Sequence, residues 1–406
     1  MRLKKMLRLR SLPVTAWQPL LLYAVFVAGL GALLWFSLGL NTTGYSASEV
    51  QALQASSSWH TIFTHPLNAP FTIITRLLLY AGHNGLLATR LSASLLGAAT
   101  LTVFYLLVRH WHGERTAVFG TLLFGASAWF LHVARLGSPS VLLFSLLLLI
   151  AAMIWHKHTN SSLSLLTCFV LGALLLYVPG MIWFIVLGAL WKWRTVDRMF
   201  KKHLWVVSGG ALLFALALAP LGLAIYHDTS LAKVIAGLPA QGWPMPDAVM
   251  HHLLNVPLSL LLRSPLDPEH WLSHLAILDY FGMAMLALGA YVYAKHLKLD
   301  RTRLLVIALV LGTLLVGLGG AVTISIIMPF VYILIAAGVG FMLERWYVVF
   351  PRNTIAQGVG LALISLAVVA SVGYSARHYF VAWPEAGATR QIFTVQPATV
   401  SVKIGR

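Results

Sequence analysis

The chain opens with "MRLKKMLRLR" (1–10) and continues, after a short link, as "WQPLLLYAVFVAGLGALLWFSLGL" (17–40). The second stretch is long and apolar enough to cross the hydrocarbon core of a bilayer as one helix. It is too long for the core of a cleavable signal peptide, and no small-residue cleavage site follows it. The pair of stretches therefore predicts an uncleaved signal anchor with its basic end in the cytoplasm.

Apolar runs of this kind recur along the whole chain, which is 59% hydrophobic and only 10% charged. A soluble protein needs far more polar surface than this. Uninterrupted apolar runs in a membrane are predicted to be helices, because a helix satisfies its own backbone hydrogen bonds. We therefore predict an all-α, polytopic transmembrane protein that forms a single integral membrane domain over residues 1–406. The eleven predicted spans are 17–40, 86–108, 116–133, 139–156, 163–178, 180–193, 204–226, 275–294, 304–321, 323–343 and 355–374.

The formal net charge of +17 has two possible explanations. A strongly basic chain can indicate nucleic-acid binding. Here, however, most basic residues lie in short loops between apolar runs, which is typical of the cytoplasmic loops of a membrane protein. We therefore predict no nucleic-acid partner, a location in the cell membrane, a cytoplasmic N-terminus and, after eleven spans, a C-terminus outside.

Two long polar stretches, 41–85 and 227–274, both fall on the predicted outer side. Long loops are where binding and catalysis tend to lie. Each stretch also contains an apolar piece, 68–82 and 248–263, that is too short or too interrupted to span. Both pieces are predicted to be interfacial helices. Any chemistry is therefore expected at the outer face.

Several classes of function are disfavoured by what the sequence lacks. No G-x-x-x-x-G-K-[ST] phosphate-binding loop and no dinucleotide fingerprint occurs. The single cysteine, Cys168, excludes a disulfide framework or a cysteine-based metal site within one chain. Charged residues are absent from the middles of the predicted spans, where ion-coupled transporters keep ionisable groups.

Glu49 is the one acid in the first outer loop, residues 41–85. The sequence "SASE" (46–49) matches a capping box at the start of a helix, with Ser46 as the cap. A carboxylate at the mouth of a membrane cavity could also deprotonate an acceptor hydroxyl. The sequence leaves both roles open.

Arg90 and Arg135 are both placed near the outer ends of predicted spans. Each could simply extend its charge toward lipid headgroups, and Arg90 could pair with a loop acid. Alternatively, a guanidinium matches the oxygens of a phosphate in a two-pronged contact. Arg135 is therefore a candidate anchor for a lipid-linked phosphate.

His60 and His65 could join Glu49 as metal ligands if the three side chains converge in space. Because that convergence is a demanding condition, we predict no metal site and no cofactor, with a divalent ion as the alternative.

Four further stretches occur in a recognisable order: "HPLNAPF" (65–71), "ATRLSASLLGA" (88–98), "GERTAVFGTLLFGASAWFLHVARLGSPSVLLFSLLLL" (113–149) and "FPRN" (350–353). Together with the acid in the first outer loop, this order resembles the membrane glycosyltransferases of the C-type fold, which include protein mannosyltransferases and aminoarabinose transferases. The similarity is clearest over residues 40–185.

The resemblance implies transfer of a sugar from a polyprenyl-phosphate carrier to a protein, lipid or glycan acceptor on the outer face. It implies that Glu49 acts on the acceptor as base or positioning group. It also implies that Arg135, Arg90 and His65 bind substrate. The departing lipid phosphate would be stabilised by Arg135 together with Arg90.

Two departures from the family pattern matter. The family usually has an Asp-Glu pair where this chain has Ser48-Glu49, and an acid where it has Ser140. Three ideas follow: a transferase that relies on Glu49, a scaffold of the same fold that has lost the chemistry, or a transporter or flippase for a lipid-linked substrate.

Overall fold

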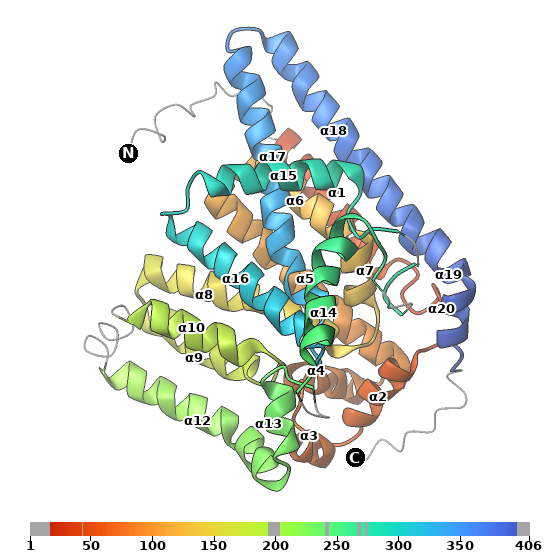
Figure 1. The fold of residues 1–406 in the computed structure, drawn as a ribbon, viewed down its shortest axis with the longest axis vertical. Coiled ribbons are helices and arrows are strands. Elements are labelled where there is room, and N and C mark those ends of the chain that lie inside the picture. The colour runs from red at the N-terminus through yellow and green to blue at the C-terminus, as the bar shows by residue number, and fades with distance from the viewer. Residues whose placement is uncertain are drawn as a thin grey trace.

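The computed structural model describes residues 17–42, 44–193, 204–239, 243–265, 269–272 and 275–395. Within these ranges the chain is almost entirely helical (Figure 1). The one β-type pairing among them is an isolated bridge between Tyr45 and Val395. The all-α prediction is therefore confirmed.

Helices occupy all eleven predicted spans. They are α1 (Trp17–Trp35), α5 (Gly85–His112), α6 (Glu114–Ala126) with α7 (Ala128–Arg135), η2 (Pro139–Phe144) with α8 (Leu146–Thr159), α9 (Ser162–Leu175), α10 (Met181–Trp191), α12 (Leu204–His227), α15 (Tyr280–Ala294), α16 (Asp300–Gly317), α17 (Met328–Val349) and α18 (Thr354–Arg377). In the described residues, five helices are long and apolar enough to cross a membrane, or six if α6 and α7 count as one. A polytopic membrane protein is confirmed, while the count of eleven remains a prediction.

The predicted span 116–133 is not a single straight helix. The chain bends by 63° between α6 and α7. The bend falls at Ser127, whose hydroxyl donates to Phe124 O and accepts from Phe130 N. A serine that bonds to both flanking backbones can end one helix and begin the next. The bend turns α7, which carries Arg135, away from the axis of α6.

Helix α17 lies in the centre of the bundle, with 72% of its apolar window buried. It packs closely against α15, because Gly289 and Gly338 face each other's backbone. A Cβ built on Gly289 would lie 1.8 Å from Leu334 O, and one on Gly338 would lie 2.0 Å from Met285 O. Small residues allow such close approach between membrane helices.

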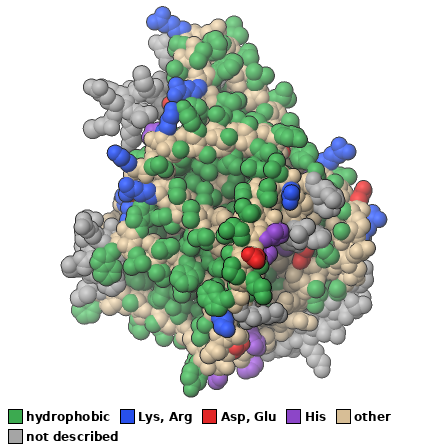
Figure 2. Space-filling model, viewed as in Figure 1, with side chains coloured by type: hydrophobic (Ala, Val, Ile, Leu, Met, Phe, Trp, Pro, Cys, Tyr) green, Lys and Arg blue, Asp and Glu red, His purple; other side chains and the backbone are tan. Residues whose placement is uncertain are grey.

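Helices α12 and α18 lie at the periphery, with only 17% of their apolar windows buried. Helix α12 packs beside α9, and α18 forms a long hairpin with α17 (Figure 1). Hydrophobic side chains cover much of the molecular face in Figure 2, with a group of Lys and Arg along its left edge. Apolar exposure on this scale is what a bilayer-facing surface requires.

The two predicted outer loops are largely helical. The first contains α2 (Ala47–Ala55), α3 (Trp59–Thr64) and α4 (Ala69–Tyr80), and the second contains α13 (Ser230–Ile235) and α14 (Pro246–Leu261). Helices α4 and α14 occupy the two predicted interfacial pieces. That these pieces are helical is confirmed, and their position in the headgroup layer remains a prediction.

The C-terminal part of the described chain folds back onto the first loop. Helix α18 continues through η4 (His378–Ala382), α19 (Trp383–Glu385) and α20 (Gly387–Ile392). Val395 then exchanges two backbone hydrogen bonds with Tyr45, at 2.9 and 3.2 Å. This return places η4 and α19 beside the residues predicted to carry the chemistry.

Candidate functional site

The site begins at the N-terminus of α2, where the predicted capping box is present. Ser46 Oγ accepts from Glu49 N at 3.3 Å, and Ser46 N donates to Glu49 Oε2 at 3.0 Å. These two contacts satisfy backbone donors that a helix start leaves open. They also fix the Glu49 carboxylate beneath the first turn of α2.

The Glu49 carboxylate is paired with Arg90 of α5. Arg90 Nε donates to Oε1 at 2.7 Å and Nη2 donates to Oε2 at 3.0 Å, while Gly137 N donates to Oε1 at 2.9 Å. With the Ser46 contact, each carboxylate oxygen accepts two hydrogen bonds. A carboxylate offers about four acceptor positions. Because Glu49 is 0% exposed, its carboxylate has no open position for an acceptor hydroxyl.

Arg90 also donates hydrogen bonds to other residues of the first loop. Nη2 donates to Thr42 Oγ1 at 3.0 Å and to Gly44 O at 3.1 Å. The guanidinium also lies 4.2 Å from the centre of the Tyr45 ring. Burial raises the pKa of Tyr45, against the lowering effect of the Arg90 charge. Arg90 therefore anchors the first loop to α5, as its alternative role of pairing with a loop acid predicts.

Gly137 reaches Glu49 because it has no side chain. A Cβ at this position would lie 2.2 Å from Thr89 Oγ1 and 2.8 Å from Thr89 Cβ. Contacts this short require either Thr89 or the turn at residue 137 to shift. The turn after α7 thus approaches α5 closely enough to add a third donor residue to the Glu49 carboxylate.

Arg135, at the end of α7, is as buried as Arg90, with each residue 2% exposed. Its Nη1 and Nη2 donate to Leu33 O at 2.7 Å and Phe36 O at 2.5 Å. Its guanidinium faces the rings of Tyr379 and Phe380, at 5.1 and 4.8 Å. Over the described ranges, Nε has no hydrogen-bond partner and no carboxylate forms an ion pair with Arg135.

A cluster of aromatic rings lies one helical turn from Arg135. We name it the histidine–tryptophan cluster, and its members come from α7, the second outer loop, η4 and α19: His132, Trp271, His378 and Trp383. The His132 ring centre lies 4.4 Å from that of Trp383, and the Trp271 ring stacks on His378 at 4.4 Å. The cluster joins three distant parts of the chain around α7.

Glu269 brings the second outer loop to the start of α2. Its Oε1 accepts from Ser46 Oγ at 2.7 Å and also from Ser48 Oγ. The side chain is partly exposed, in contrast to Glu49. Sequence reasoning did not single out this acid, because 221 positions separate it from Ser48 and no local motif surrounds it.

The other predicted residues lie apart from this group. His65 ends α3, is exposed, and acts electrostatically on Asp228. Two further acids, Asp228 and Asp279, are both bonded to nearby backbone: Asp228 Oδ1 accepts from Ser230 N at 2.9 Å and Asp279 Oδ1 from Gly282 N at 2.7 Å. The Ser230 hydrogen bonds lower the pKa of Asp228.

The part of the chain that the structure describes contains no preformed set of metal ligands. No group of three His, Cys, Asp or Glu side chains there could hold a metal ion. His60 is exposed on α3, whereas the Glu49 oxygens are filled by protein donors.

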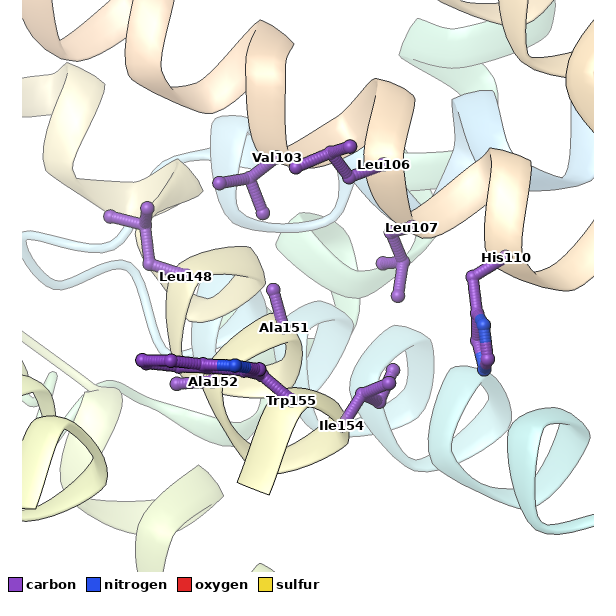
Figure 3. Close-up of a pocket in the computed structure, with 9 residues that line it drawn as sticks. All are labelled: Val103, Leu106, Leu107, His110, Leu148, Ala151, Ala152, Ile154 and Trp155. Atoms are coloured by element: carbon purple, nitrogen blue, oxygen red, sulfur yellow. The ribbon is translucent and has the colours of Figure 1, made fainter. Parts of the chain in front are cut away.

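An apolar groove of about 430 Å³ lies between α5 and α8 (Figure 3). Its lining includes Val103, Leu148 and Trp155, with His110 at one end. His110 is 20 residues beyond Arg90 on α5, which corresponds to about 30 Å along a helix. The groove is therefore remote from the polar group around Glu49, and its apolar lining suits a hydrocarbon chain.

Comparison with known proteins gives matches only at the level of three-dimensional structure. No family model matches the chain. No curated protein matches it by sequence. Two solved structures of ArnT from Cupriavidus metallidurans, in the apo state and bound to undecaprenyl phosphate, each match with a TM-score of 0.56. The identities are 15% and 14%, and the matches cover 93% of this chain and 78% and 77% of the ArnT chain. The fold is thus that of ArnT, a membrane protein of the C-type glycosyltransferase fold, as the resemblance implied.

Proposed function

We propose that this chain is a membrane glycosyltransferase that moves a sugar from a polyprenyl-phosphate carrier to an acceptor at the outer face. Its fold is that of ArnT, which has been solved with undecaprenyl phosphate bound. The observation that carries the proposal is Arg135, a buried cation near the predicted outer end of the bundle that has no carboxylate partner among the described residues.

An isolated buried charge is costly, because desolvation is not repaid by a nearby counter-ion. Within the part of the chain that the structure describes, Arg135 donates to two carbonyl oxygens and contacts no negative group. A phosphate that reached its Nε side would supply the missing charge and an acceptor for the open donor. The leaving group of the proposed reaction is such a phosphate, so the same contact would stabilise the charge that develops as the sugar departs.

In the proposed mechanism, the acceptor oxygen attacks the anomeric carbon in a single displacement and the polyprenyl phosphate leaves with the bonding electrons. Arg135 holds the phosphate. The buried pair of Glu49 and Arg90 acts by position: it fixes the first loop, α5 and the turn after α7 around the reacting groups. His65 is a more distant contact for substrate, at the end of α3.

The proposal predicts that undecaprenyl phosphate binds the purified protein and that Arg135 governs the binding. Arg135→Lys keeps the charge but loses the planar fork of donors. We expect binding, measured by native mass spectrometry in detergent, to weaken at least about tenfold, the equivalent of one charge-assisted hydrogen bond. Arg377→Lys, on the exposed end of α18, is the matched control and should bind normally.

Transfer is then measured by release of polyprenyl phosphate from a panel of polyprenyl-phosphate sugars. The acceptor source is membranes from a strain that lacks the gene. Release by wild type and a sharp loss in Arg135→Lys would support the proposal. Binding and membrane translocation of the donor without release would instead identify a transporter or flippase. If the wild-type protein shows neither binding nor release, a non-catalytic scaffold of this fold would be the remaining explanation.

The proposed location of the chemistry depends on orientation, with the N-terminus cytoplasmic and the C-terminus outside. A single native cysteine makes this testable. In a Cys168→Ser background, Arg390→Cys and Lys298→Cys place thiols at two exposed positions that the charge pattern assigns to opposite sides. An impermeant maleimide should label only the residue 390 thiol in intact cells, and the reverse pattern would invert the topology.

A further inference from the structure

We infer that the groove between α5 and α8 is a binding site for one anionic phospholipid of the cytoplasmic leaflet. An acyl chain of the lipid lies in the groove, and the lipid phosphate lies at the end marked by His110. This site is separate from the proposed transfer reaction, because it lies at the opposite end of α5 from Arg90.

The lining of the groove suits a hydrocarbon chain. All of its lining residues belong to α5 or α8, and all except His110 are apolar. The side chains of the two helices face one another across the groove (Figure 3). Leu107 and Ala152 are buried, whereas Leu106 and Trp155 are 51% and 42% exposed. The groove therefore has an apolar interior and is open to the surface that faces the bilayer.

The depth of the groove corresponds to part of one leaflet. Val103 and His110 are seven positions apart on α5, which corresponds to about 10 Å along a helix. The hydrocarbon core of a bilayer is about 30 Å thick. His110 and Trp155 both lie at the predicted cytoplasmic ends of their spans, and tryptophan is enriched at the boundary between membrane and water. The groove thus extends from the headgroup level into the cytoplasmic leaflet.

The headgroup end of the groove is basic. The ring centres of His110 and His158 lie 5.1 Å apart. Lys157, the neighbour of His158, lies close enough to act electrostatically on His110. All three side chains are exposed. An ammonium group and imidazole N–H groups are donors that a phosphate accepts, so a lipid phosphate at this level would meet a positive charge and hydrogen-bond donors together.

The nearby acids do not neutralise Lys157. Glu114 is paired with Arg109 at 3.5 Å, and Asp300 is paired with Lys192 at 2.7 Å. Asp300 is also influenced by the Lys157 charge, but its short contact is with Lys192. Lys157 forms no ion pair in the part of the chain that the structure describes. The basic end therefore favours a lipid with net negative charge over a zwitterionic lipid.

A polyprenyl phosphate also combines a hydrocarbon chain with a phosphate, but its proposed position is different. The carrier phosphate is assigned to Arg135 near the outer end of the bundle, whereas His110 lies about 30 Å from Arg90 along α5. Anionic phospholipids give the cytoplasmic leaflet its negative surface potential, and basic pockets between membrane helices on that side bind their headgroups. The occupant we propose is therefore a phospholipid.

The test titrates the delipidated protein in detergent with dioleoyl phosphatidylglycerol and, separately, with dioleoyl phosphatidylcholine, and counts bound lipids by native mass spectrometry. We expect the tightest phosphatidylglycerol to bind at least about tenfold more tightly than phosphatidylcholine. Lys157→Glu reverses the charge at the headgroup end and should weaken that binding at least about tenfold. Arg352→Glu makes the same change at an exposed position, at the tip of the α17–α18 hairpin (Figure 1), and should bind normally.

A second variant blocks the hydrocarbon part of the site. Ala151 lines the groove, whereas Met153, 43% exposed on the same helix, does not. Ala151→Phe should weaken phosphatidylglycerol binding at least about tenfold, which corresponds to the loss of about two buried CH₂ groups. Met153→Phe is the matched control and should bind normally. A melting curve shows whether each variant is folded, and Lys157→Glu decides alone if Ala151→Phe is not.

Three results would overturn the inference. Equal weakening by Lys157→Glu and Arg352→Glu would mean that the lipid responds to the overall charge of the chain rather than to this groove. Equal binding of the two phospholipids would mean that the groove recognises no headgroup. Displacement of phosphatidylglycerol by undecaprenyl phosphate, lost in Ala151→Phe, would assign the groove to the carrier. Binding of undecaprenyl phosphate to Lys157→Glu should stay at the wild-type level, which keeps this test distinct from that of Arg135.

Discussion

Two arginines of the same burial stand in contrasting surroundings. Arg90 donates to both oxygens of Glu49 and to the backbone and side chain of the first loop. Arg135 donates to two backbone carbonyls and faces two aromatic rings, and one of its buried nitrogens has no acceptor among the residues that the structure describes. Equal burial of one residue type thus accompanies two different electrostatic situations.

The contrast distinguishes an arginine with a structural role from an arginine with a role in ligand binding. A neutralised ion pair with every lone pair used holds parts of the fold together and has no capacity for a ligand. An uncompensated cation is unfavourable for the fold alone, and a bound anion would relieve that cost. We therefore assign the Glu49–Arg90 pair to the architecture of the site and Arg135 to its substrate, and the following variants test this division.

Arg90→Met should have the largest effect on stability. It would leave the Glu49 carboxylate buried without its counter-ion, and breaking a buried pair in this way costs about 3–5 kcal/mol. We expect a large fall in the midpoint of thermal aggregation, followed by size-exclusion chromatography in detergent. A second variant, Glu49→Leu/Arg90→Met, removes both charges and should recover much of the loss.

A normal melting point for Arg90→Met would contradict the structural assignment of the pair. In that case Glu49 would have to be neutral or hydrated in the folded protein, and its role as base for the acceptor would return. Equal instability of the single and double variants would mean that side-chain shape, rather than charge, holds the first loop.

Gly137→Ala should have an intermediate effect. The added methyl group would collide with Thr89, and overpacking of this kind costs about 1–3 kcal/mol. The shift would also draw the Gly137 N–H away from Glu49. Gly188→Ala, where a Cβ meets nothing within 4 Å, is the control in the same melting assay and should stay close to wild type.

Thr89→Ala tests the cause of the Gly137→Ala effect. This change removes the hydroxyl that lies nearest to the added methyl group, so Thr89→Ala/Gly137→Ala should be more stable than Gly137→Ala alone. If the second change brings no recovery, the Gly137 turn is positioned by something other than its approach to α5.

The sequence predicts the class of the fold well, because membrane helices depend mainly on local composition and length. It also predicts the capping box at Ser46, which spans only four residues. The break in the span at Ser127 is harder to predict from the sequence, because the apolar run continues through the bend. Short apolar helices such as α10 show why a count of spans from hydropathy alone stays open.

The partners of the site residues depend on distant parts of the chain. Glu49 meets Arg90 and Gly137 across 41 and 88 positions, and Ser48 meets Glu269 across 221. No periodicity in the sequence encodes contacts of this range. The pairing of Arg90 with a loop acid could be named as one option, whereas the arrival of Glu269 at α2 required the folded chain.

Arg135→Met should have the smallest effect on stability. The change loses two hydrogen bonds to carbonyls, worth about 0.5–1.5 kcal/mol each and more when the donor is charged. It also removes a buried cation without a counter-ion, which offsets that loss. We therefore expect a melting midpoint close to wild type, and well above that of Arg90→Met, whereas binding of undecaprenyl phosphate should be strongly reduced.

A melting loss as large as that of Arg90→Met would show that Arg135 is also a structural element. The distinction between the two arginines would then fail, and the anion for the proposed transfer would have to be held by another basic residue at the same end.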